Sequence, residues 1–226
     1  MTETVAAAGP ELLGAAGIDL VIFDLDGVLI DVQHAEDGAL ALLAARMGLQ
    51  LSQAEYTEMF SGRQLQACID LIEARTHSPA PDDAVAFVRA SCARLIGPVL
   101  EPIDGVRQAL AAIKVPTCVA SNSPPEIIRD RLAAAGIADF DGRTYSAYTI
   151  QAWKPDPKLF RWAAADLGAD PARTIVVEDS AVGVIGARAA GMRAFQFCGS
   201  GASPHASATL TFSAMGALPE LIGAAA

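Results

Sequence analysis

Hydrophobic residues follow two different patterns along this chain. Short unbroken runs such as Val21–Phe23, Pro116–Ala120 and Thr174–Val177 predict strands that are buried on both faces, as in a parallel sheet. Apolar residues at helical spacing follow the runs, for example from Asp156 to Leu167, and predict helices between the strands. This alternation predicts an α/β fold with an open, doubly wound (Rossmann-like), mostly parallel sheet that helices cover on both faces.

Residues 32 to about 98 interrupt the alternation, because they carry helical spacing almost throughout. Leu40, Leu43 and Met47 mark one helix, and the sequence from Ser52 to Glu55 has the form of a capping box that opens the next. The sequence therefore predicts a core of residues 1–30 and 104–226, with an inserted helical domain at residues 31–103.

The bulk properties of the chain restrict its function. Its 226 residues are 52% hydrophobic and carry a net charge of −10, which predicts a soluble protein and argues against broad nucleic-acid binding. The cysteines lack the spacing of a zinc site or a disulfide framework, which favours reduced thiols in the cytoplasm. The first seventeen residues contain no Lys or Arg, so we expect neither a secretory signal nor a membrane span there, and we expect disorder at their beginning.

Two acidic residues follow the first predicted strand. Strand alternation would place the side chains of Asp24 and Asp26 on the same side, and Gly27 would let the chain turn just after them. Two carboxylates buried side by side repel each other unless a cation or a shared proton offsets the repulsion. The pair therefore favours a chemical role over the alternative of two exposed loop acids.

Polar residues also follow two later strands. Ser121 and Asn122 end one strand, and Glu178 and Asp179 end another, while Lys154 lies in a loop. Each group alone has an ordinary interpretation, as a turn, an N-cap or a solvated lysine. Because a parallel sheet gathers the carboxyl ends of its strands at one edge, we expect the groups to lie together and to form a ligand site.

The combined set of residues suits phosphoryl transfer. It offers carboxylates for Mg²⁺, a carboxylate nucleophile, and a hydroxyl, an amide and a lysine for phosphate. The segment from Ser123 to Glu126 predicts a helix start with Ser123 as N-cap. A helix N-terminus just after Ser121 would add free N–H groups for an anion.

Four segments resemble the motifs of the haloacid dehalogenase-like hydrolase superfamily, in the same order. They are Asp24–Leu29, Ser121–Asn122, Lys154–Pro155 and Val177–Ser180. The helical insertion after the first motif is similar to the α-helical cap of the superfamily's phosphatase and β-phosphoglucomutase branch. The resemblance implies a phosphoric monoester hydrolase that acts on a small phosphorylated substrate.

The resemblance also implies a role for each motif residue. Asp24 would be the nucleophile that forms an aspartyl-phosphate, and Asp26 the general acid and base. Phosphate would bind to Ser121, Asn122 and Lys154. Mg²⁺ would bind to Asp24, to the main-chain carbonyl of Asp26 and to Asp179, with Glu178 nearby or linked through water.

Other positions help to decide which branch of the superfamily this chain resembles. Branches of the superfamily that act on carbon–halogen or phosphonate bonds do not keep an acid at the position of Asp26. A β-phosphoglucomutase-like mutase is the alternative, but its expected histidine at the start of the cap is Glu36 here, with His34 two residues early. A hydroxyl residue usual in that branch is replaced by Val32. A non-catalytic relative that only binds metabolites is a third hypothesis.

Smaller segments are similar to bacterial sugar-acid phosphatases of the 6-phosphogluconate phosphatase type, including the sequence from Gln151 to Pro157. Trp153 and His205 belong to this resemblance, although a packed wall residue and a solvated loop histidine are the alternative interpretations. Arg63 lies where the branch places a substrate-specificity loop and could meet a substrate anion, or it could be an ordinary exposed arginine. The sequence leaves the exact substrate and the oligomeric state open.

Overall fold

The computed structural model describes residues 17–60, 63–97, 99–137, 140, 142–199 and 203–226. The expectation of disorder at the beginning of the chain concerns residues 1–16, which lie outside this part. The chain divides into two compact units, one of Met1–Asp31 with Glu101–Ala226 and one of Val32–Leu100. Each unit has a hydrophobic core of its own.

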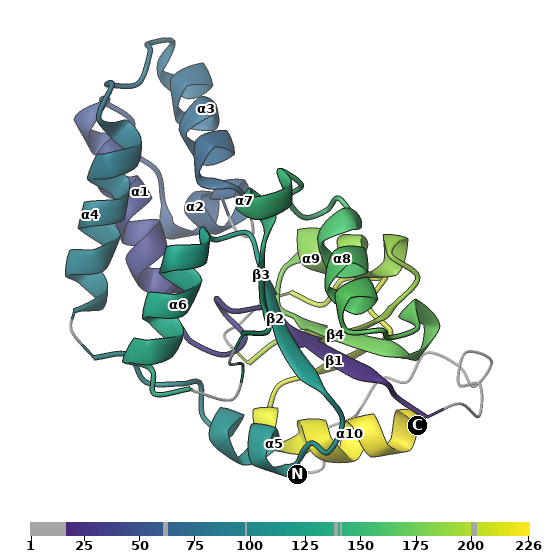
Figure 1. Cartoon of the computed structure of the whole chain (residues 1–226). Helices are drawn as coiled ribbons and strands as arrows, with labels where there is room; N and C mark the ends of the chain where they lie inside the picture. The colour runs from purple at the N-terminus through teal and green to yellow at the C-terminus, as the bar shows by residue number, and fades with distance from the viewer. Residues whose placement is uncertain (1–16, 61–62, 98, 138–139, 141, 200–202) are drawn as a thin grey trace. The chain divides into compact units, whose positions relative to one another are not determined.

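The larger unit is built on a six-stranded sheet in which every neighbouring pair is parallel (Figure 1). The strand order is β3-β2-β1-β4-β5-β6, so the order reverses beside β1. Ligands in such sheets bind beyond the carboxyl ends of the strands at this reversal. The predicted Rossmann-like fold class is confirmed. The strands are β1 (Leu20–Phe23), β2 (Thr117–Ser121), β3 (Thr144–Ser146), β4 (Thr174–Glu178), β5 (Arg193–Phe197) and β6 (Leu210–Phe212).

Helices cover the sheet because its strands are apolar on both faces. One core cluster joins Leu20 and Ile22 of β1 to residues of α8 and α9 such as Phe160 and Val184, and the alternate residues of β1 are equally buried. Burial on both faces is the pattern expected for a parallel sheet. The helices of this unit are α5 (Val106–Ala112), α6 (Pro125–Ala134), α7 (Ala147–Ile150), α8 (Lys158–Asp166), α9 (Ala181–Ala189) and α10 (Leu218–Ala225), with short 3₁₀ turns at Pro171–Arg173 and Met215–Ala217.

The smaller unit is entirely helical in its described part. Its helices are α1 (Gln33–Arg46), α2 (Gln53–Phe60), α3 (Leu65–Thr76) and α4 (Ala84–Ile96). The predicted capping box is present, since the Ser52 N–H donates to Glu55 Oε2 at 2.8 Å and the Glu55 N–H donates to Ser52 Oγ at 3.4 Å. Its core includes Leu43, Ile69 and Ile72, which are almost fully buried. That this unit acts as a cap stays a prediction.

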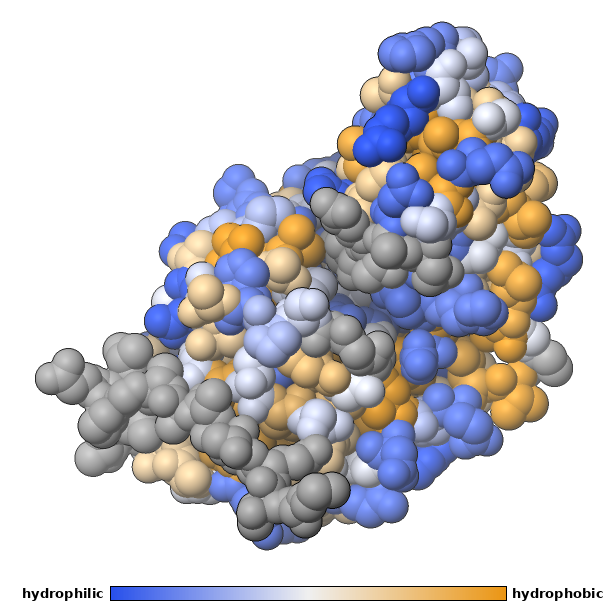
Figure 2. All heavy atoms as spheres, turned by 180° about the vertical axis from the view of Figure 1, so that it is seen from behind, coloured by the Kyte–Doolittle hydropathy of each residue, from blue (hydrophilic) through white to orange (hydrophobic). Residues whose placement is uncertain are grey.

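The surface mixes hydrophobic and hydrophilic residues in small groups on the face that Figure 2 shows. Leu42, Leu95, Val99 and Ile185 are large hydrophobic residues that are exposed, and the first three belong to the helical unit. Within the described part of the chain, no helix combines the length and the apolar character needed to cross a membrane.

Candidate active site

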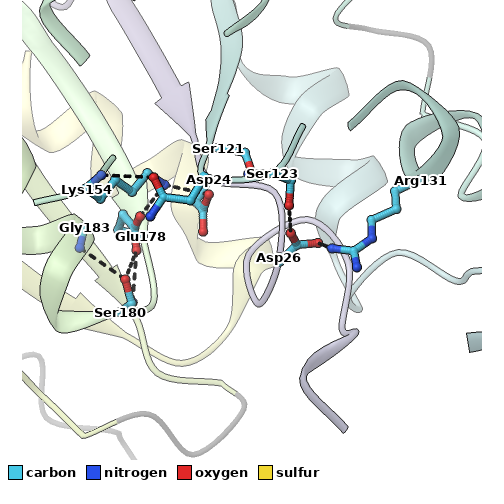
Figure 3. A network of polar contacts seen from close by, with 10 residues as sticks. Asp24, Asp26, Ser121, Ser123, Arg131, Lys154, Glu178, Ser180 and Gly183 are labelled. Carbon is cyan, nitrogen blue, oxygen red and sulfur yellow. Dashed lines mark hydrogen bonds and ion pairs between the residues drawn. The ribbon is translucent and has the colours of Figure 1, made fainter. Parts of the chain in front are cut away.

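The polar residues predicted from the strand ends lie in the sheet unit, and Figure 3 shows most of them close together. Ser121 and Glu178 are the last residues of β2 and β4, which are the two neighbours of β1. Asp24 follows directly after β1, and its N–H donates to the Val177 carbonyl of β4 at 2.9 Å. The parallel sheet thus brings residues from distant parts of the sequence to one edge, beside the reversal of strand order.

Lys154 joins two carboxylates at this edge. Its Nζ lies 2.6 Å from Asp24 Oδ1 and 2.6 Å from Glu178 Oε1. The exposed fraction of the side chain is 3% for Lys154, 12% for Asp24 and 0% for Glu178. Charges this far from water are costly unless they are paired and hydrogen-bonded, so these three residues depend on one another.

The second oxygen of Glu178 is held by the start of α9. Ser180 donates to Glu178 Oε2 from its N–H at 3.0 Å and from its hydroxyl at 2.9 Å. The same hydroxyl accepts from the Gly183 N–H at 3.1 Å, which makes Ser180 the N-cap of α9. Gly183 leaves the room that Glu178 occupies, because a Cβ there would lie 1.9 Å from the carboxylate. Both oxygens of Glu178 therefore have protein partners.

The cluster carries more negative than positive charge. Burial raises the pKa of Asp24 to about 7, and the lowering effect of Lys154 does not cancel the combined effect of burial, Glu178 and Asp26. Burial and the nearby Glu178 and Asp24 carboxylates also raise the pKa of Asp179 well above its ordinary value. Burial lowers the pKa of Lys154, but Asp24 and Glu178 raise it by more, so its ammonium form is stabilised. A further cation would relieve the remaining repulsion.

Three carboxylates are placed so that they could hold such a cation. Asp24, Glu178 and Asp179 each offer an oxygen within 4.8 Å of the others. Gly27 lies against this group with a φ of +82°, and a Cβ there would be 2.2 Å from Asp179 Oδ2. Carboxylate oxygens suit Mg²⁺, so the residues fit the predicted metal. The carboxylate of Asp26 does not belong to the group.

Asp26 has partners of its own, away from Lys154 (Figure 3). The Arg131 Nη1 atom lies 2.6 Å from Asp26 Oδ1, and the Ser123 hydroxyl donates to Asp26 Oδ2 at 3.1 Å. The expectation of alternating strand side chains does not apply here, because β1 ends at Phe23 and both acids lie beyond it. The two carboxylates are therefore held by different cations.

Ser123 is not the N-cap that the sequence predicts. The N-cap of α6 is Pro124, which makes no side-chain cap bond and has an extended ψ of 152°. A residue that precedes a proline avoids the helical region, so Pro125 forces the helix to begin one residue later than expected. The Ser123 hydroxyl is thereby available to Asp26.

The other predicted phosphate ligands help to fix the loops. Asn122 Oδ1 accepts from the Lys154 N–H at 2.9 Å, and Ser121 Oγ accepts from the Ser123 N–H at 3.0 Å. Asn122 thus positions the backbone of Lys154. That Ser121, Asn122 and Lys154 bind phosphate stays a prediction.

Trp153 and His205 lie in the sheet unit, where both have structural contacts, although the buried Trp153 Nε1 has no hydrogen-bond partner among the described residues. Trp153 is partly buried against the core, and its ring meets that of Tyr148 edge-on with centroids 5.4 Å apart. The backbone N–H of His205 donates to Gln196 Oε1 at 2.7 Å. The imidazole Nδ1 of His205 accepts from the backbone N–H of Ser207 at 3.2 Å. These contacts favour packing and loop formation.

Arg63 is exposed and belongs to the helical unit, where its N–H donates to the Phe60 carbonyl at 3.1 Å. Ser61 and Gly62, which precede it in the predicted specificity loop, lie outside the described residues. The part of Arg63 in substrate recognition stays a prediction.

Sequence reasoning missed two residues that support the site. Arg131 lies in the last turn of α6, where a basic residue is usual because it complements the helix dipole, so nothing in the sequence sets it apart. Gln196 is almost fully buried on β5, and its Nε2 donates to the Asp179 carbonyl at 2.9 Å. A glutamine between two phenylalanines of a buried strand was the available signal.

This combination of sheet and strand-end carboxylates defines a class of hydrolase. A model of the haloacid dehalogenase-like hydrolase family matches residues 18–191, which is more than half of the chain. The chain therefore belongs to the haloacid dehalogenase-like hydrolase family and is an enzyme. The resemblance stated from its motifs is confirmed.

Individual relatives cover most of the chain. The chain is 33% identical to the 6-phosphogluconate phosphatase of Escherichia coli (strain K12), with 90% of this chain and 94% of that protein covered. It is 31% identical to hexitol phosphatase B of the same strain, with 76% and 80% covered. A haloacid dehalogenase-like protein of unknown function from Agrobacterium tumefaciens has a solved structure with a TM-score of 0.79 and 32% identity, covering 92% of this chain and 99% of that one.

A β-phosphoglucomutase from Clostridium difficile also has a TM-score of 0.79, with 92% of this chain and 96% of that chain covered. At 21% identity this match shows the shared fold alone.

Proposed function

We propose that this chain is a Mg²⁺-dependent phosphatase that hydrolyses sugar phosphates or sugar-acid phosphates through an aspartyl-phosphate intermediate. The observation that supports this most is Lys154, buried between Asp24 and Glu178. A carboxylate repels a phosphate dianion unless positive charge lies beside both, and Lys154 supplies such charge at Asp24 Oδ1. The relatives named as 6-phosphogluconate phosphatase and hexitol phosphatase support the substrate class.

The reaction divides into two displacements at phosphorus. In the first, a carboxylate oxygen of Asp24 attacks phosphorus, the bond to the ester oxygen breaks, and Asp26 gives a proton to the leaving oxygen. In the second, water attacks the phosphorus of the aspartyl-phosphate, Asp26 takes a proton from that water, and the bond to Asp24 breaks. Inorganic phosphate and the free alcohol are the products.

The remaining strand-end residues hold the phosphoryl group and the metal. Ser121 and Lys154 would bind phosphate oxygens, and Asn122 would assist by fixing the Lys154 backbone. Asp24, Asp179 and the main-chain carbonyl of Asp26 would hold Mg²⁺. When bound, the ion supplies positive charge that screens the phosphate from the carboxylates. Glu178 would lie beside the metal or be linked to it through water, while its Oε1 contacts Lys154 and its Oε2 accepts from Ser180.

A β-phosphoglucomutase-like phosphomutase is the second candidate function. The shared fold is compatible with it, but Val32 and Glu36 depart from the residues expected of that branch. A non-catalytic metabolite-binding protein is a weaker alternative, because the reactive residues Asp24, Asp26 and Lys154 are all present.

A phosphate-release screen with the purified full chain tests the proposal. Sugar phosphates, sugar-acid phosphates and nucleotides are incubated with Mg²⁺ or with EDTA, and inorganic phosphate is measured. We expect release from sugar or sugar-acid phosphates with Mg²⁺ and none with EDTA. An isomer in place of inorganic phosphate would identify a mutase.

Asp24→Asn tests the covalent mechanism in the same screen. Loss of the nucleophile should lower turnover on the order of 10⁴-fold or more, with the fold retained. Asp130→Asn changes an exposed acid on α6 and is the matched control, which should keep parental activity. Parental rates in Asp24→Asn would show that no aspartyl-phosphate forms on this residue.

A further inference from the structure

The side chain of Asp26 is fixed by two residues that the family motifs do not include. Arg131 contacts one carboxylate oxygen and Ser123 the other, at 2.6 and 3.1 Å. The backbone of Asp26 belongs to a tight turn in which the Gly27 N–H donates to the Ile30 carbonyl at 2.7 Å, but this turn does not fix the side-chain rotamer. The contacts of Arg131 and Ser123 with the two carboxylate oxygens fix that rotamer.

Both residues are themselves held in place. Arg131 lies on α6, which is anchored in the core through Ile128 and Leu132. The carbonyl of Ser123 accepts from the Ser146 hydroxyl at 2.7 Å, and its N–H donates to Ser121 Oγ at 3.0 Å. A rigid support of this kind can hold a reacting group in one orientation.

The contact between Arg131 and Asp26 is more buried than an ordinary surface ion pair on the same helix. The exposed fraction of the side chain is 11% for Arg131 and 18% for Asp26. It is 72% for Arg129 and 66% for Asp130, which also form an ion pair. A complement to the helix dipole would explain a basic residue in the last turn of α6, but not its contact with a loop carboxylate from beyond β1.

We propose that Arg131 is a positioning residue that holds the carboxylate of Asp26 in the orientation needed for proton transfer. This inference rests on the proposed phosphatase function. Orientation matters most in the second displacement, in which the carboxylate must reach the attacking water while that water faces phosphorus. Ser123 supports the same orientation from the other oxygen.

Arg131→Met should slow the second displacement more than the first. With p-nitrophenyl phosphate, whose leaving group needs little help from an acid, the initial burst of p-nitrophenol should keep its rate within about threefold. Steady-state kcat should fall by about 10- to 100-fold, within the range of acid–base catalysis, and KM should fall with it, because kcat/KM depends on binding and the first displacement alone. Arg131→Lys, which keeps the charge, should restore part of kcat.

Arg129→Met is the matched control and should keep parental kcat. The inference is overturned if Arg131→Met keeps parental kcat, if Arg129→Met loses as much, or if the burst slows in parallel with the steady state. A rise in KM alone would also overturn it, because Arg131 would then bind substrate.

A crystal structure of Arg131→Met tests the inference without depending on enzyme activity. We expect the Asp26 carboxylate to leave its place in the parent, and an unmoved carboxylate would overturn the inference. If Arg131→Met does not fold, the structure and kinetics of Arg131→Lys decide in the same way. A parent without phosphatase activity would refute the proposed function, while the position of Asp26 in the two crystal structures would still show whether Arg131 fixes it.

Discussion

Asp24 and Asp26 lie two residues apart but in different surroundings. Asp24 is 12% exposed and contacts Lys154, which also contacts Glu178, and those two side chains are 3% and 0% exposed. Asp26 contacts Arg131, and this pair keeps 11% and 18% of its side-chain surface exposed. Glu178 cannot reach water if it loses Lys154, whereas the Asp26 side chain keeps 18% of its surface exposed, although its Oδ1, the atom that Arg131 contacts, is itself buried. We therefore expect stability and chemistry to be more tightly coupled at Asp24 than at Asp26.

Lys154→Met should have the largest effect of the substitutions around Asp24, on both stability and turnover. Two buried carboxylates would lose their shared cation, which costs about 3 to 5 kcal/mol of unfolding free energy. Turnover should also fall on the order of 1,000-fold or more, because the phosphate loses a cation in a site with little water. Urea unfolding and phosphate release measure the two effects.

Lys158→Met is the control for Lys154→Met, because Lys158 is an exposed lysine whose side chain is 74% accessible. It should change neither quantity appreciably. A Lys154→Met protein with parental stability would mean that Asp24 and Glu178 do not need Lys154 in the folded state.

Gly183→Ala should have the next largest effect. The added Cβ would overlap the Glu178 carboxylate, so Glu178 must move away from Lys154. Overpacking of this kind costs about 1 to 3 kcal/mol, and turnover should fall with stability because the same contact is disturbed.

Gly223→Ala gives the matched control for Gly183→Ala, since Gly223 is also helical but its Cβ would meet nothing within 4 Å. It should leave stability unchanged or raise it slightly. Equal effects of the two substitutions in urea unfolding would show that Glu178 is not confined by Gly183.

The contrast between Asp24 and Asp26 also separates the contacts that the sequence could predict from those that it could not. The gathering of Asp24, Ser121 and Glu178 was predictable, because buried parallel strands fix where their carboxyl ends lie, whereas Lys154 comes from a loop that the strands alone do not place. The surroundings of Asp26 depend on where β1 stops and where α6 begins, and both depend on single residues. The proline pair shifted the start of α6 and released Ser123, while Arg131 looked like any basic residue near a helix end.

Ser123→Ala should change stability least of these substitutions. It also tests the contrast between Asp24 and Asp26 most directly. It removes one hydrogen bond to Asp26, and the partly exposed carboxylate can take water in its place, so the loss of unfolding free energy should stay below about 1 kcal/mol. The kcat of phosphate release should still fall about tenfold, because Asp26 keeps only Arg131 and gains rotamer freedom. Ser123→Thr retains the hydroxyl and should recover most of kcat. A Ser123→Ala protein that loses several kcal/mol in urea unfolding, yet keeps parental kcat, would show that the Asp26 side is structural and that the contrast with Asp24 is wrong.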